Sequence, residues 1–503
     1  MAELRGREKQ IVDERIKKIA ALKESGVNPY AHKFEGERIH SAEIKEKNSK
    51  LKEEEFAKGG AVRIAGRMMT KRKMGKIAFA KVQDLKGNIQ IVFQKDETPE
   101  ETFEFFKKAD AGDIIGVEGR VFRTQRGEIS VMADKLEILT KAILPLPEKF
   151  HGLKNDEEKL RKRYLDIIMN PEVKEIFIKK QKFWSTIRNF LIEREFLEVE
   201  TPILENSSGG AAATPFNTHH NALDLDVYLR ISMGELWQKK LLVAGYEKTF
   251  EIGRQFRNEG MDAEHLQDYS QMEFYWAYAD FEDGMRLVEE LYKEIAMATL
   301  GSLKFEAGGH KIDLGKKWKK YDFESLIKEK TGVDIYGTDK EEIMAKLNEL
   351  KMEYDDSVGK WRLVDLLWKY CRKDISGPGF LIGQPVELTP LAKRNVKDPR
   401  KVEQFQVILG GSENGNGYSE LNDPLDQEER FKSQKALGEE GDSEAMDHDE
   451  GFVEALKYGM PPACGFGFSE RLFSFMMNRP IRECVAFPLM KPEEAGEKEK
   501  KKK

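Results

Sequence analysis

Residues 248–278 read KTFEIGRQFRNEGMDAEHLQDYSQMEFYWAY, and this stretch predicts the architecture of the larger part of the chain. Two runs rich in aromatic and apolar residues, 248–256 and 270–278, enclose a polar loop. Extended apolar runs on either side of a polar loop are typical of a long β-hairpin. The hairpin therefore predicts an antiparallel sheet in this part of the chain.

Charged and polar residues gather at the end of this hairpin. Because side chains alternate along a strand, Glu273 and Tyr275 share one face of the returning strand. Arg257 and Glu259 share a face if the first strand continues into the loop. Taken by themselves, these residues fit a ligand site and a surface ion-pair ladder equally well.

The sequence around the hairpin predicts a domain of mixed α and β structure. A long helix is expected over 173–196, because apolar residues recur there at helical spacing, and a strand-like segment follows over 197–204. A further strand with one buried face is expected from the alternation of Leu223, Leu225, Val227, Leu229 and Ile231. The expected domain spans 161–492 and is built on an antiparallel sheet flanked by helices.

Upstream of residue 144 the hydrophobic period changes to two. Five short alternating runs predict five strands, and one helical segment, 99–109, falls between the third and the fourth. This order is typical of an OB-fold β-barrel, here assigned to 61–143, a fold that commonly binds single-stranded nucleic acid. The fold class is therefore α+β.

The remaining segments are extensions and a linker. An N-terminal helical extension over 1–60 is expected to hold an amphipathic helix ending near Gly26 and a polar helix over 41–57. The lysines of these helices fit a solvated surface and an RNA contact equally well. A proline-containing linker is assigned to 144–160, and the basic tail 493–503 is expected to be disordered.

Bulk composition excludes several classes of protein. The chain of 503 residues is long enough for two or more domains, and its net charge of −6 means that any nucleic-acid contact needs a local basic patch. Its three cysteines are widely spaced and form no CxxC pair, so no zinc site is expected. No run of about 20 apolar residues occurs, so we expect a cytoplasmic protein without a membrane partner.

Three ordered motifs give the chain a family resemblance. FLEVETPIL at 196–204 with Pro202, the FRNEG hairpin at 256–260, and GFGFSERL at 465–472 resemble motifs 1, 2 and 3 of the class II aminoacyl-tRNA synthetases. Within that class the chain resembles the lysyl-tRNA synthetase family over nearly its whole length. The matching segments are GVNPYAHKF at 26–34, RYLD at 163–166, THHNAL at 218–223, LTPLAK at 388–393 and GNGYSELND at 415–423.

The resemblance implies an activity and its substrates. Members of the family activate L-lysine with ATP to lysyl-adenylate, release pyrophosphate, and transfer lysine to the 3′ end of tRNA(Lys). Arg257 and Arg471 match the catalytic arginines, and an arginine fork can bridge a phosphate and a carboxylate. The residues implied to bind ATP are Arg257, Glu259, His265, Tyr269, Glu413 and Arg471.

The resemblance also implies a lysine pocket with surplus carboxylates, because lysine carries two ammonium groups. Glu235 and the carbonyl of Gly210 are implied to take the α-ammonium, and Glu420 and Tyr275 the ε-ammonium. Arg257 is implied to hold the substrate carboxylate, and Glu273 and Asn416 complete the shell. A basic residue is expected in place of Glu420 in a site for aspartate, so its absence counts against aspartyl and asparaginyl enzymes.

Magnesium and tRNA contacts follow from the same comparison. Mg²⁺ is the cofactor expected with ATP, and Glu413 matches one family ligand. Gln406 stands where the family has a second acidic ligand, and its carbonyl can ligate a hard cation without adding charge. In the OB-fold, Phe79, Gln90 and Glu128 match the positions that read the anticodon. As bare residues, Phe79 and Gln90 also fit a core position and a surface position.

Two further segments depart from the family pattern. In motif 3 the glycine nearest Arg471 is Gly467, four residues before it instead of three, which predicts either a bulge or a strand one residue shorter. The approach to Glu235, Ser232-Met233-Gly234, is one residue longer than usual.

The resemblance also bears on assembly and on rival functions. Motif 1 and the apolar stripe of the helix before it resemble the family's dimer interface, so we expect a homodimer. One alternative is a paralogue that transfers lysine to a protein, but such paralogues lack the OB domain. Another is an inactive synthetase-like module that only binds tRNA.

Overall fold

The computed structural model describes residues 6–147, 153, 155–206, 213–439 and 449–492. The expected lysine-site residue Gly210 and the tail 493–503 lie outside these residues. The chain divides into two compact units, 1–156 and 157–503. The division falls inside the segment assigned above to a linker.

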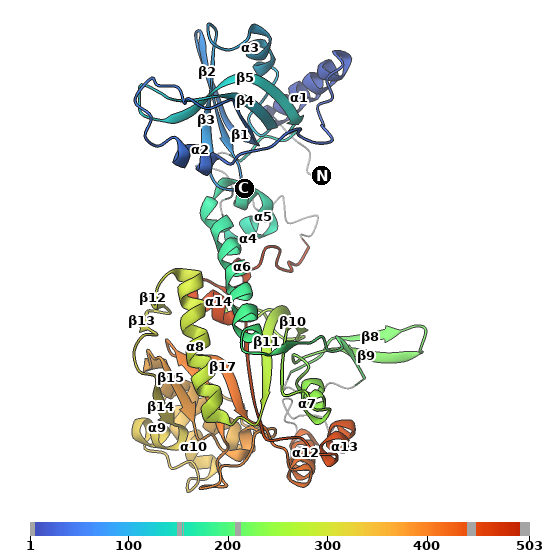
Figure 1. Ribbon diagram of the computed structural model, residues 1–503. Helices are drawn as coiled ribbons and strands as arrows, with labels where there is room; N and C mark the ends of the chain where they lie inside the picture. The colour runs from blue at the N-terminus through green and yellow to red at the C-terminus, as the bar shows by residue number, and fades with distance from the viewer. Residues whose placement is uncertain (1–5, 148–152, 154, 207–212, 440–448, 493–503) are drawn as a thin grey trace. The chain divides into compact units, whose positions relative to one another are not determined.

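The first unit is a closed five-stranded barrel. Its strands pair in the order β1-β2-β3-β5-β4, and α3 lies between β3 and β4 in the sequence. The predicted OB-fold barrel is therefore confirmed (Figure 1). Leu22 of α1 and Ile44 of α2 belong to the same core as the barrel residues, so both N-terminal helices pack on the barrel. The elements are α1 Gly6–Glu24, α2 Ser41–Lys47, β1 Val62–Met74, β2 Ile77–Gln83, β3 Asn88–Gln94, α3 Glu100–Phe106, β4 Ile114–Arg123 and β5 Ile129–Thr140.

The predicted polar helix over 41–57 is wrong in length, because α2 ends at Lys47. Asn48 follows it, and the Asn48 side-chain amide donates a hydrogen bond to the carbonyl of Ile44 at 2.8 Å. Asparagine favours helix ends because its short side chain competes for backbone groups in this way. Further on, Phe56 forms an isolated antiparallel bridge with Phe122 of β4, so the chain there is extended along the barrel.

The second unit is built around an eight-stranded sheet in the order β14-β15-β16-β17-β18-β11-β10-β6. The predicted hairpin is confirmed: Lys248 pairs with Trp276, and Phe256 pairs with Asp268. The expected antiparallel sheet is found from β15 to β10, while the two edge strands add parallel pairs, β6 with β10 and β14 with β15. Long crossovers through helices bring both edge strands back in the same direction as their neighbours.

The elements of the second unit are many, and most serve to cover this sheet. They are α4 Asp156–Arg161, α5 Arg163–Met169, α6 Pro171–Ile192, β6 Leu197–Glu198, β7 Leu204–Glu205, β8 Asn217–His220, β9 Leu225–Leu229, α7 Glu235–Val243, β10 Lys248–Phe256, β11 Asp268–Ala277, α8 Phe281–Leu300, β12 Lys304–Ala307, β13 His310–Asp313, β14 Lys319–Asp322, α9 Phe323–Thr331, α10 Lys340–Glu349, α11 Lys360–Cys371, β15 Gly379–Ile382, β16 Gln404–Leu409, β17 Ser412–Ser419, α12 Pro424–Glu439, α13 Glu450–Lys457, β18 Ala463–Ser469 and α14 Arg471–Met476.

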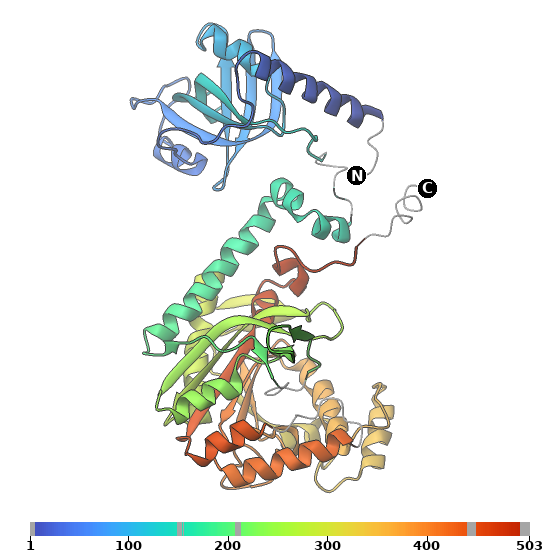
Figure 2. The same ribbon diagram turned by 90° about the vertical axis from the view of Figure 1, so that its right-hand side faces the viewer.

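The two faces of the large sheet have opposite character. Alternate residues on its central strands, such as Phe274, Phe405 and Phe466, are buried in one apolar core with α6 and α8, which run alongside the sheet (Figure 1). Their neighbours in sequence, such as Glu273 and Gln406, point to the other face because the side-chain period of a strand is two. Helices α9–α11 form a separate cluster with Leu381 and Ile408 near the β14–β15 edge of the sheet (Figure 2).

Two predictions about strands need correction. The segment 197–204 forms only two two-residue strands, β6 and β7, because Pro202 between them has no N–H to donate to a ladder. The strand β9 lies in a small sheet with β7 and β8, outside the main one. Of its predicted buried face, Val227 is buried but Leu223 and Leu225 are exposed, because no layer covers that end of the hairpin (Figure 1).

Helix α6 confirms the predicted long amphipathic helix, although it ends at Ile192. Its apolar residues Phe183, Ile187 and Phe190 are fully buried in the core of its own unit. The stripe that suggested a dimer interface is therefore already covered. Among the described residues, no helix has both the length and the apolarity to cross a membrane.

Because the two units have separate hydrophobic cores, we expect each unit to have its own free energy of unfolding. All six tryptophans lie between 184 and 368, so tryptophan fluorescence reports only the second unit. Phe405 is fully buried and stacks on Phe466 with 5.4 Å between ring centroids. Phe405→Ala should lower the free energy of unfolding of this unit by about 3–5 kcal/mol, because it leaves a cavity in the core. Urea unfolding followed by tryptophan fluorescence measures this change.

The matched control is Phe93→Ala in the barrel. Phe93 is also fully buried and stacks on Phe106 at 4.1 Å, so the same chemical change is made in the other core. It should leave the midpoint of the fluorescence transition in place. An equal shift of that midpoint by both variants would mean that the two cores unfold together.

Candidate active site

A cavity of about 510 Å³ opens on the polar face of the large sheet. It brings together most of the residues that the sequence assigned to ATP and lysine binding. Of these, Glu235, Arg257, His265, Tyr269, Glu273, Tyr275, Gln406, Glu413, Asn416, Glu420 and Arg471 line it. Glu259 does not line the cavity: it is exposed, and its carboxylate accepts a weak hydrogen bond from the Thr214 amide at 3.4 Å.

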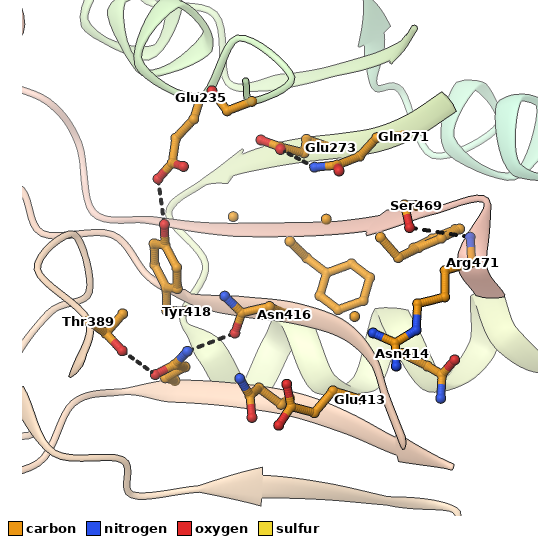
Figure 3. A pocket seen from close by; sticks show the side chains of 18 of the residues that line it. Glu235, Gln271, Glu273, Thr389, Glu413, Asn414, Asn416, Tyr418, Ser469 and Arg471 are labelled. Atoms are coloured by element: carbon orange, nitrogen blue, oxygen red, sulfur yellow. Dashed lines mark hydrogen bonds between the residues drawn. The ribbon is translucent and has the colours of Figure 1, made fainter. Parts of the chain in front are cut away.

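One part of the cavity is acidic and deeply buried. Glu235 begins α7, Glu273 lies on β11, and Glu420 follows β17, so three separate elements converge. Glu273 Oε2 accepts a hydrogen bond from the Tyr275 hydroxyl at 2.9 Å, and its Oε1 accepts from the Gln271 amide, as Figure 3 shows for the latter pair. The predicted shared face of Glu273 and Tyr275 is thereby confirmed.

Lys239 carries the counter-charge within this acidic part. Its ammonium lies 2.8 Å from Glu235 Oε1 and 2.7 Å from Glu420 Oε2. The Tyr418 hydroxyl also bonds Glu235, from the strand below it in Figure 3. Two elements distant in sequence, α7 and β17, are therefore joined through one lysine and one tyrosine.

Burial shifts the pKa values of these groups. Burial, with the nearby Glu235 carboxylate, raises the pKa of Glu273 to about 7. Burial also raises the pKa of Glu420, to about 8, although the Lys239 ammonium opposes the shift. Burial by itself lowers the pKa of Lys239, but the carboxylates of Glu235 and Glu420 outweigh it and raise that pKa above its ordinary value. Lys239 therefore stays charged at neutral pH.

The opposite part of the cavity is cationic. Arg471, at the start of α14, donates a hydrogen bond to Ser412 Oγ at 2.7 Å and pairs with Glu264. Its backbone amide also donates to Ser469 Oγ at 3.3 Å (Figure 3). Arg257 lies just past β10, donates from Nε to the Ile231 carbonyl at 3.3 Å, and sits 6.0 Å from the centre of the Tyr269 ring. The first strand ends at Phe256, so the condition under which Arg257 and Glu259 would share a strand face is not met. The polar residues of that loop bond locally, as in the His265–Asp262 pair at 2.9 Å.

The residues that match metal ligands are not grouped as a metal centre. Glu413 Oε1 accepts from the Trp368 indole at 2.7 Å and lies 2.6 Å from the Arg372 guanidinium. Gln406 lies on the neighbouring strand, directly opposite Asn416 in the β16–β17 ladder. In the described part of the chain, no group of three or more His, Cys, Asp or Glu residues is placed to hold a metal ion. The Glu413 carboxylate is already paired, and the Gln406 amide is neutral. These two groups therefore suit a cation that binds together with anionic ligands of its own.

Two glycines of β18 leave room for the acidic residues. A Cβ on Gly467 would lie 2.7 Å from Glu273 Cγ, and a Cβ on Gly465 would meet Glu420 Oε1 and lie 2.7 Å from the Tyr275 ring. The strand pairs with β11 without interruption from Ala463 to Ser469, so motif 3 contains neither a bulge nor a gap in that ladder. The altered glycine spacing therefore leaves a regular strand that ends two residues before Arg471.

In the barrel, Phe79 and Gln90 lie on the outer face of adjacent strands. Phe79 is partly buried against a small apolar cluster with Val92 and Met132. The Gln90 amide donates to Ser130 Oγ at 3.0 Å, and Glu128 is exposed just before β5. Phe79 and Gln90 therefore belong to the neighbouring strands β2 and β3, Glu128 directly precedes β5, and Gln90 is directly opposite Ser130 of β5 in the ladder.

Sequence reasoning missed Lys239, Tyr418 and Arg372. A signal existed for two of them. Lys239 is one helical turn after Glu235, the i, i+4 spacing of a helical ion pair. Tyr418 is two residues before Glu420, on the same face of an alternating segment. Arg372 could not be found, because its pairing with Glu413 spans 41 residues and depends on how α11 packs.

Comparisons with known proteins agree with this architecture. Residues 155–491 match the family model of class II tRNA synthetases (D, K and N), and residues 62–139 match that of the OB-fold nucleic acid binding domain. The lysine–tRNA ligase of Lactococcus lactis subsp. lactis is 46% identical over 487 residues, covering 95% of this chain and 97% of that protein. The lysine–tRNA ligase of Bacillus subtilis is 44% identical over 480 residues, covering 94% and 96%.

A third relative extends the same pattern. The lysine–tRNA ligase of Staphylococcus aureus is 43% identical over 484 residues, covering 95% of this chain and 97% of that protein. Similarity at this level over both units, together with a polar cavity on a class II sheet, settles the family. The chain belongs to the lysine–tRNA ligase family of class II tRNA synthetases.

Proposed function

We propose that this protein is a lysine–tRNA ligase, which joins L-lysine to ATP as lysyl-adenylate and then transfers lysine to the 3′ end of tRNA(Lys). The observation that carries the proposal is the convergence of three buried carboxylates, Glu235, Glu273 and Glu420, in one cavity with Arg257. Two ammonium groups need such an acidic pocket, and a carboxylate to be activated needs a neighbouring guanidinium.

In the first step, an oxygen of the lysine carboxylate forms a bond to the α-phosphorus of ATP, and the bond to the bridging oxygen of pyrophosphate breaks. Little covalent work is left to the protein, so positioning and charge stabilisation dominate. Arg257 would bridge the substrate carboxylate and the α-phosphate. Arg471 would contact the terminal phosphate from the other side, after leaving its ion pair with Glu264.

The remaining ATP contacts follow from the cavity lining. Tyr269 would stack on one face of the adenine, opposite Arg471. His265 would reach the outer phosphates, and Glu259 would accept from the adenine amino group. Because Glu259 is exposed next to Thr214, this last contact requires the loop after β10 to close over the nucleotide.

The lysine contacts use the acidic part of the cavity. Glu235 and the Gly210 carbonyl would take the α-ammonium, while Glu420 and the Tyr275 oxygen would take the ε-ammonium. The Tyr275 hydroxyl already donates its proton to Glu273, so its oxygen is left as an acceptor for the ε-ammonium. Asn416, whose Oδ1 accepts from Gln404 at 2.8 Å, would complete the shell beside Glu273.

In the second step, a hydroxyl of the terminal ribose of tRNA attacks the acyl carbon, and AMP leaves.

Mg²⁺ would screen the triphosphate charge, with Glu413 and Gln406 as its protein ligands. The barrel would read the anticodon by stacking on Phe79 and by hydrogen bonds from Gln90 and Glu128. We infer that these reactions occur in the cytoplasm.

We also propose that the protein is a homodimer through motif 1. The stripe of α6 is buried, but Ile192 at its end, Leu197, Ile203 and Leu204 are 46–50% exposed. These residues surround β6, a two-residue strand at the edge of the large sheet. Apolar side chains next to an open sheet edge are typical of a surface that a second copy covers.

Amino-acid-dependent exchange of pyrophosphate into ATP tests the main proposal. Each of the twenty amino acids is assayed separately with the full-length protein and Mg²⁺. Exchange should occur with lysine at a rate at least about 100-fold above that with the other amino acids, because those lack the second ammonium. Absence of exchange with lysine would sink the proposal and favour a module that only binds tRNA.

Replacement of Arg257 separates chemistry from tRNA binding. Arg257→Ala should lower the exchange rate at least about 100-fold, because it removes a charge aimed at the reacting phosphate. Filter binding of tRNA(Lys) should change less than about twofold, because a different unit reads the anticodon. The control is Arg254→Ala, since Arg254 is half-exposed on β10, just before Arg257, and its side chain forms a surface ion pair with Asp268. Parallel loss of exchange and tRNA binding in Arg257→Ala would contradict this division of labour.

The dimer proposal is tested on the exposed residues of motif 1. Leu197→Lys combined with Ile203→Asp should convert the protein from dimer to monomer in light scattering at micromolar concentration, because it places charges in the buried interface. Val396→Asp is the control, since Val396 is 88% exposed and lies far along the chain from motif 1. A monomeric mass for the unaltered protein would disprove the dimer directly.

A further inference from the structure

Lysine side chains are usually exposed at the protein surface, but that of Lys239 is buried. It is only 1% exposed, and its ammonium is held between the carboxylates of Glu235 and Glu420. The rings of Tyr275, Tyr418 and Phe452 lie 5.5–5.9 Å from its Nζ atom. A buried ammonium survives only when carboxylates and aromatic faces compensate for its lost hydration.

The two carboxylates are those that the proposed function assigns to the substrate ammonium groups. Lys239 uses one oxygen of each: Glu235 Oε1 and Glu420 Oε2. Glu420 Oε1 is buried and has no hydrogen-bond partner among the described residues. Gly465 has no side chain, and Glu420 Oε1 and the Tyr275 ring occupy the space that a Cβ there would need. Lys239 thus fixes the carboxylate of Glu420 and leaves its second oxygen for another donor.

The formal charges of the pocket make the role of Lys239 specific. Glu235, Glu273 and Glu420 contribute three negative charges, while Lys239 and Arg257 contribute two positive ones. Elsewhere in the lining, Arg471 pairs with Glu264, Glu413 with Arg372 and Asp365 with Lys369, and Arg362 is a further charged residue. Counted over the five residues Glu235, Glu273, Glu420, Lys239 and Arg257 with their carboxyls ionised, the lysine pocket therefore has a formal charge of −1. Lysine, with two ammonium groups and one carboxylate, has a charge of +1.

We propose that Lys239 is a specificity-determining residue that holds the lysine pocket at a single net negative charge, so that it selects a monocationic amino acid over dicationic diamines. This inference rests on the proposed function. Without Lys239 the formal charge of the pocket with its carboxyls ionised would be −2, which complements a dication such as lysine amide, in which the carboxylate charge of lysine is removed. Lys239 acts through Glu235 and Glu420 and is a positioning residue for both.

Protonation gives the proposal a second readout. The groups facing Lys239 are Glu235 on its own helix, Glu420 and Tyr418 from the β17 segment, and Tyr275 with Glu273 from β11. Burial, opposed by Lys239, raises the pKa of Glu420 to about 8. Loss of the Lys239 charge raises this pKa further, so Glu420 stays protonated to a higher pH than in the unaltered protein and ionises only when a bound ammonium displaces the proton. Lysine binding must then displace that proton, and its affinity should improve only at higher pH.

The experiment compares full-length Lys239→Met, Lys239→Gln and Lys239→Arg with the unaltered protein. Calorimetry measures binding of L-lysine and of lysine amide, and exchange assays give the KM for lysine from pH 6 to 9. The control is Lys240→Met, on the same helix, where Lys240 lies over the Trp237 ring at 4.6 Å. Glutamine can still donate to both carboxylates, so it carries the test if methionine prevents folding.

In both neutral variants, the preference for lysine over lysine amide should fall at least about tenfold, which corresponds to about 1.4 kcal/mol. The KM for lysine depends on pH, and the midpoint of this dependence should lie at least about one pH unit higher in these variants than in the unaltered protein. Calorimetry in buffers of different ionisation enthalpy should detect more protons released on lysine binding. Lys239→Arg and Lys240→Met should behave like the unaltered protein, and the KM for ATP should stay within about twofold throughout.

Two results would overturn the proposal. One is loss of lysine affinity with an unchanged lysine-to-amide preference and an unchanged pH profile, which is what a purely structural role gives. The other is an equal shift in Lys239→Arg, because arginine keeps the charge. Failure of the unaltered protein to bind lysine at all would instead refute the proposed function.

Discussion

The alternation of side chains along four adjacent strands is the constraint on which the catalytic unit depends. On β16, β17, β18 and β11, one set of residues packs with α6 and α8 into a continuous apolar core. The other set faces the opposite side of the sheet, because a period of two leaves no third direction, and there it lines the cavity or, like Ile408, packs with α9–α11. Glu273 and Tyr275 reach the cavity for the same geometric reason that Phe274 between them reaches the core. The apolar core and the active-site cavity therefore lie on opposite faces of the same strands.

The electrostatics of the cavity follow from where charged residues leave that sheet. Carboxylates come from the middle of β11, the end of β17 and the start of α7, so they meet deep in the unit. The arginines stand just beyond the ends of β10 and β18, closer to solvent. An inner acidic region and an outer cationic region suit a cationic amino acid held below an anionic nucleotide. The buried Lys239 allows three carboxylates to share so small a volume, because an uncompensated cluster would take up protons instead.

Much of the fold could be predicted from local sequence pattern. The five strands of the barrel and the hairpin 248–278 alternate clearly, and long helices such as α6 have unmistakable periodicity. Predictions failed where an end or a layer depended on distant groups. The helix predicted over 41–57 stops at Asn48 through a side-chain bond, and Leu223 and Leu225 alternate on a hairpin that no layer covers. Most site residues came from a family resemblance, not from pattern. Partners such as Lys239 for Glu420 and Arg372 for Glu413 needed the packed structure, because those pairings join elements far apart in the sequence.

The bare backbone of Gly465 beneath Glu420 has one more consequence. A pocket wall made of side chains can change shape when a rotamer changes, whereas a wall made of strand backbone moves only if the sheet moves. At Gly465, β18 is paired on both sides, with Tyr418 of β17 and Tyr275 of β11. Glu420 and Tyr275 lie directly against this backbone, so neither side chain can retreat toward the strand, and the acidic part of the cavity is rigid at this point.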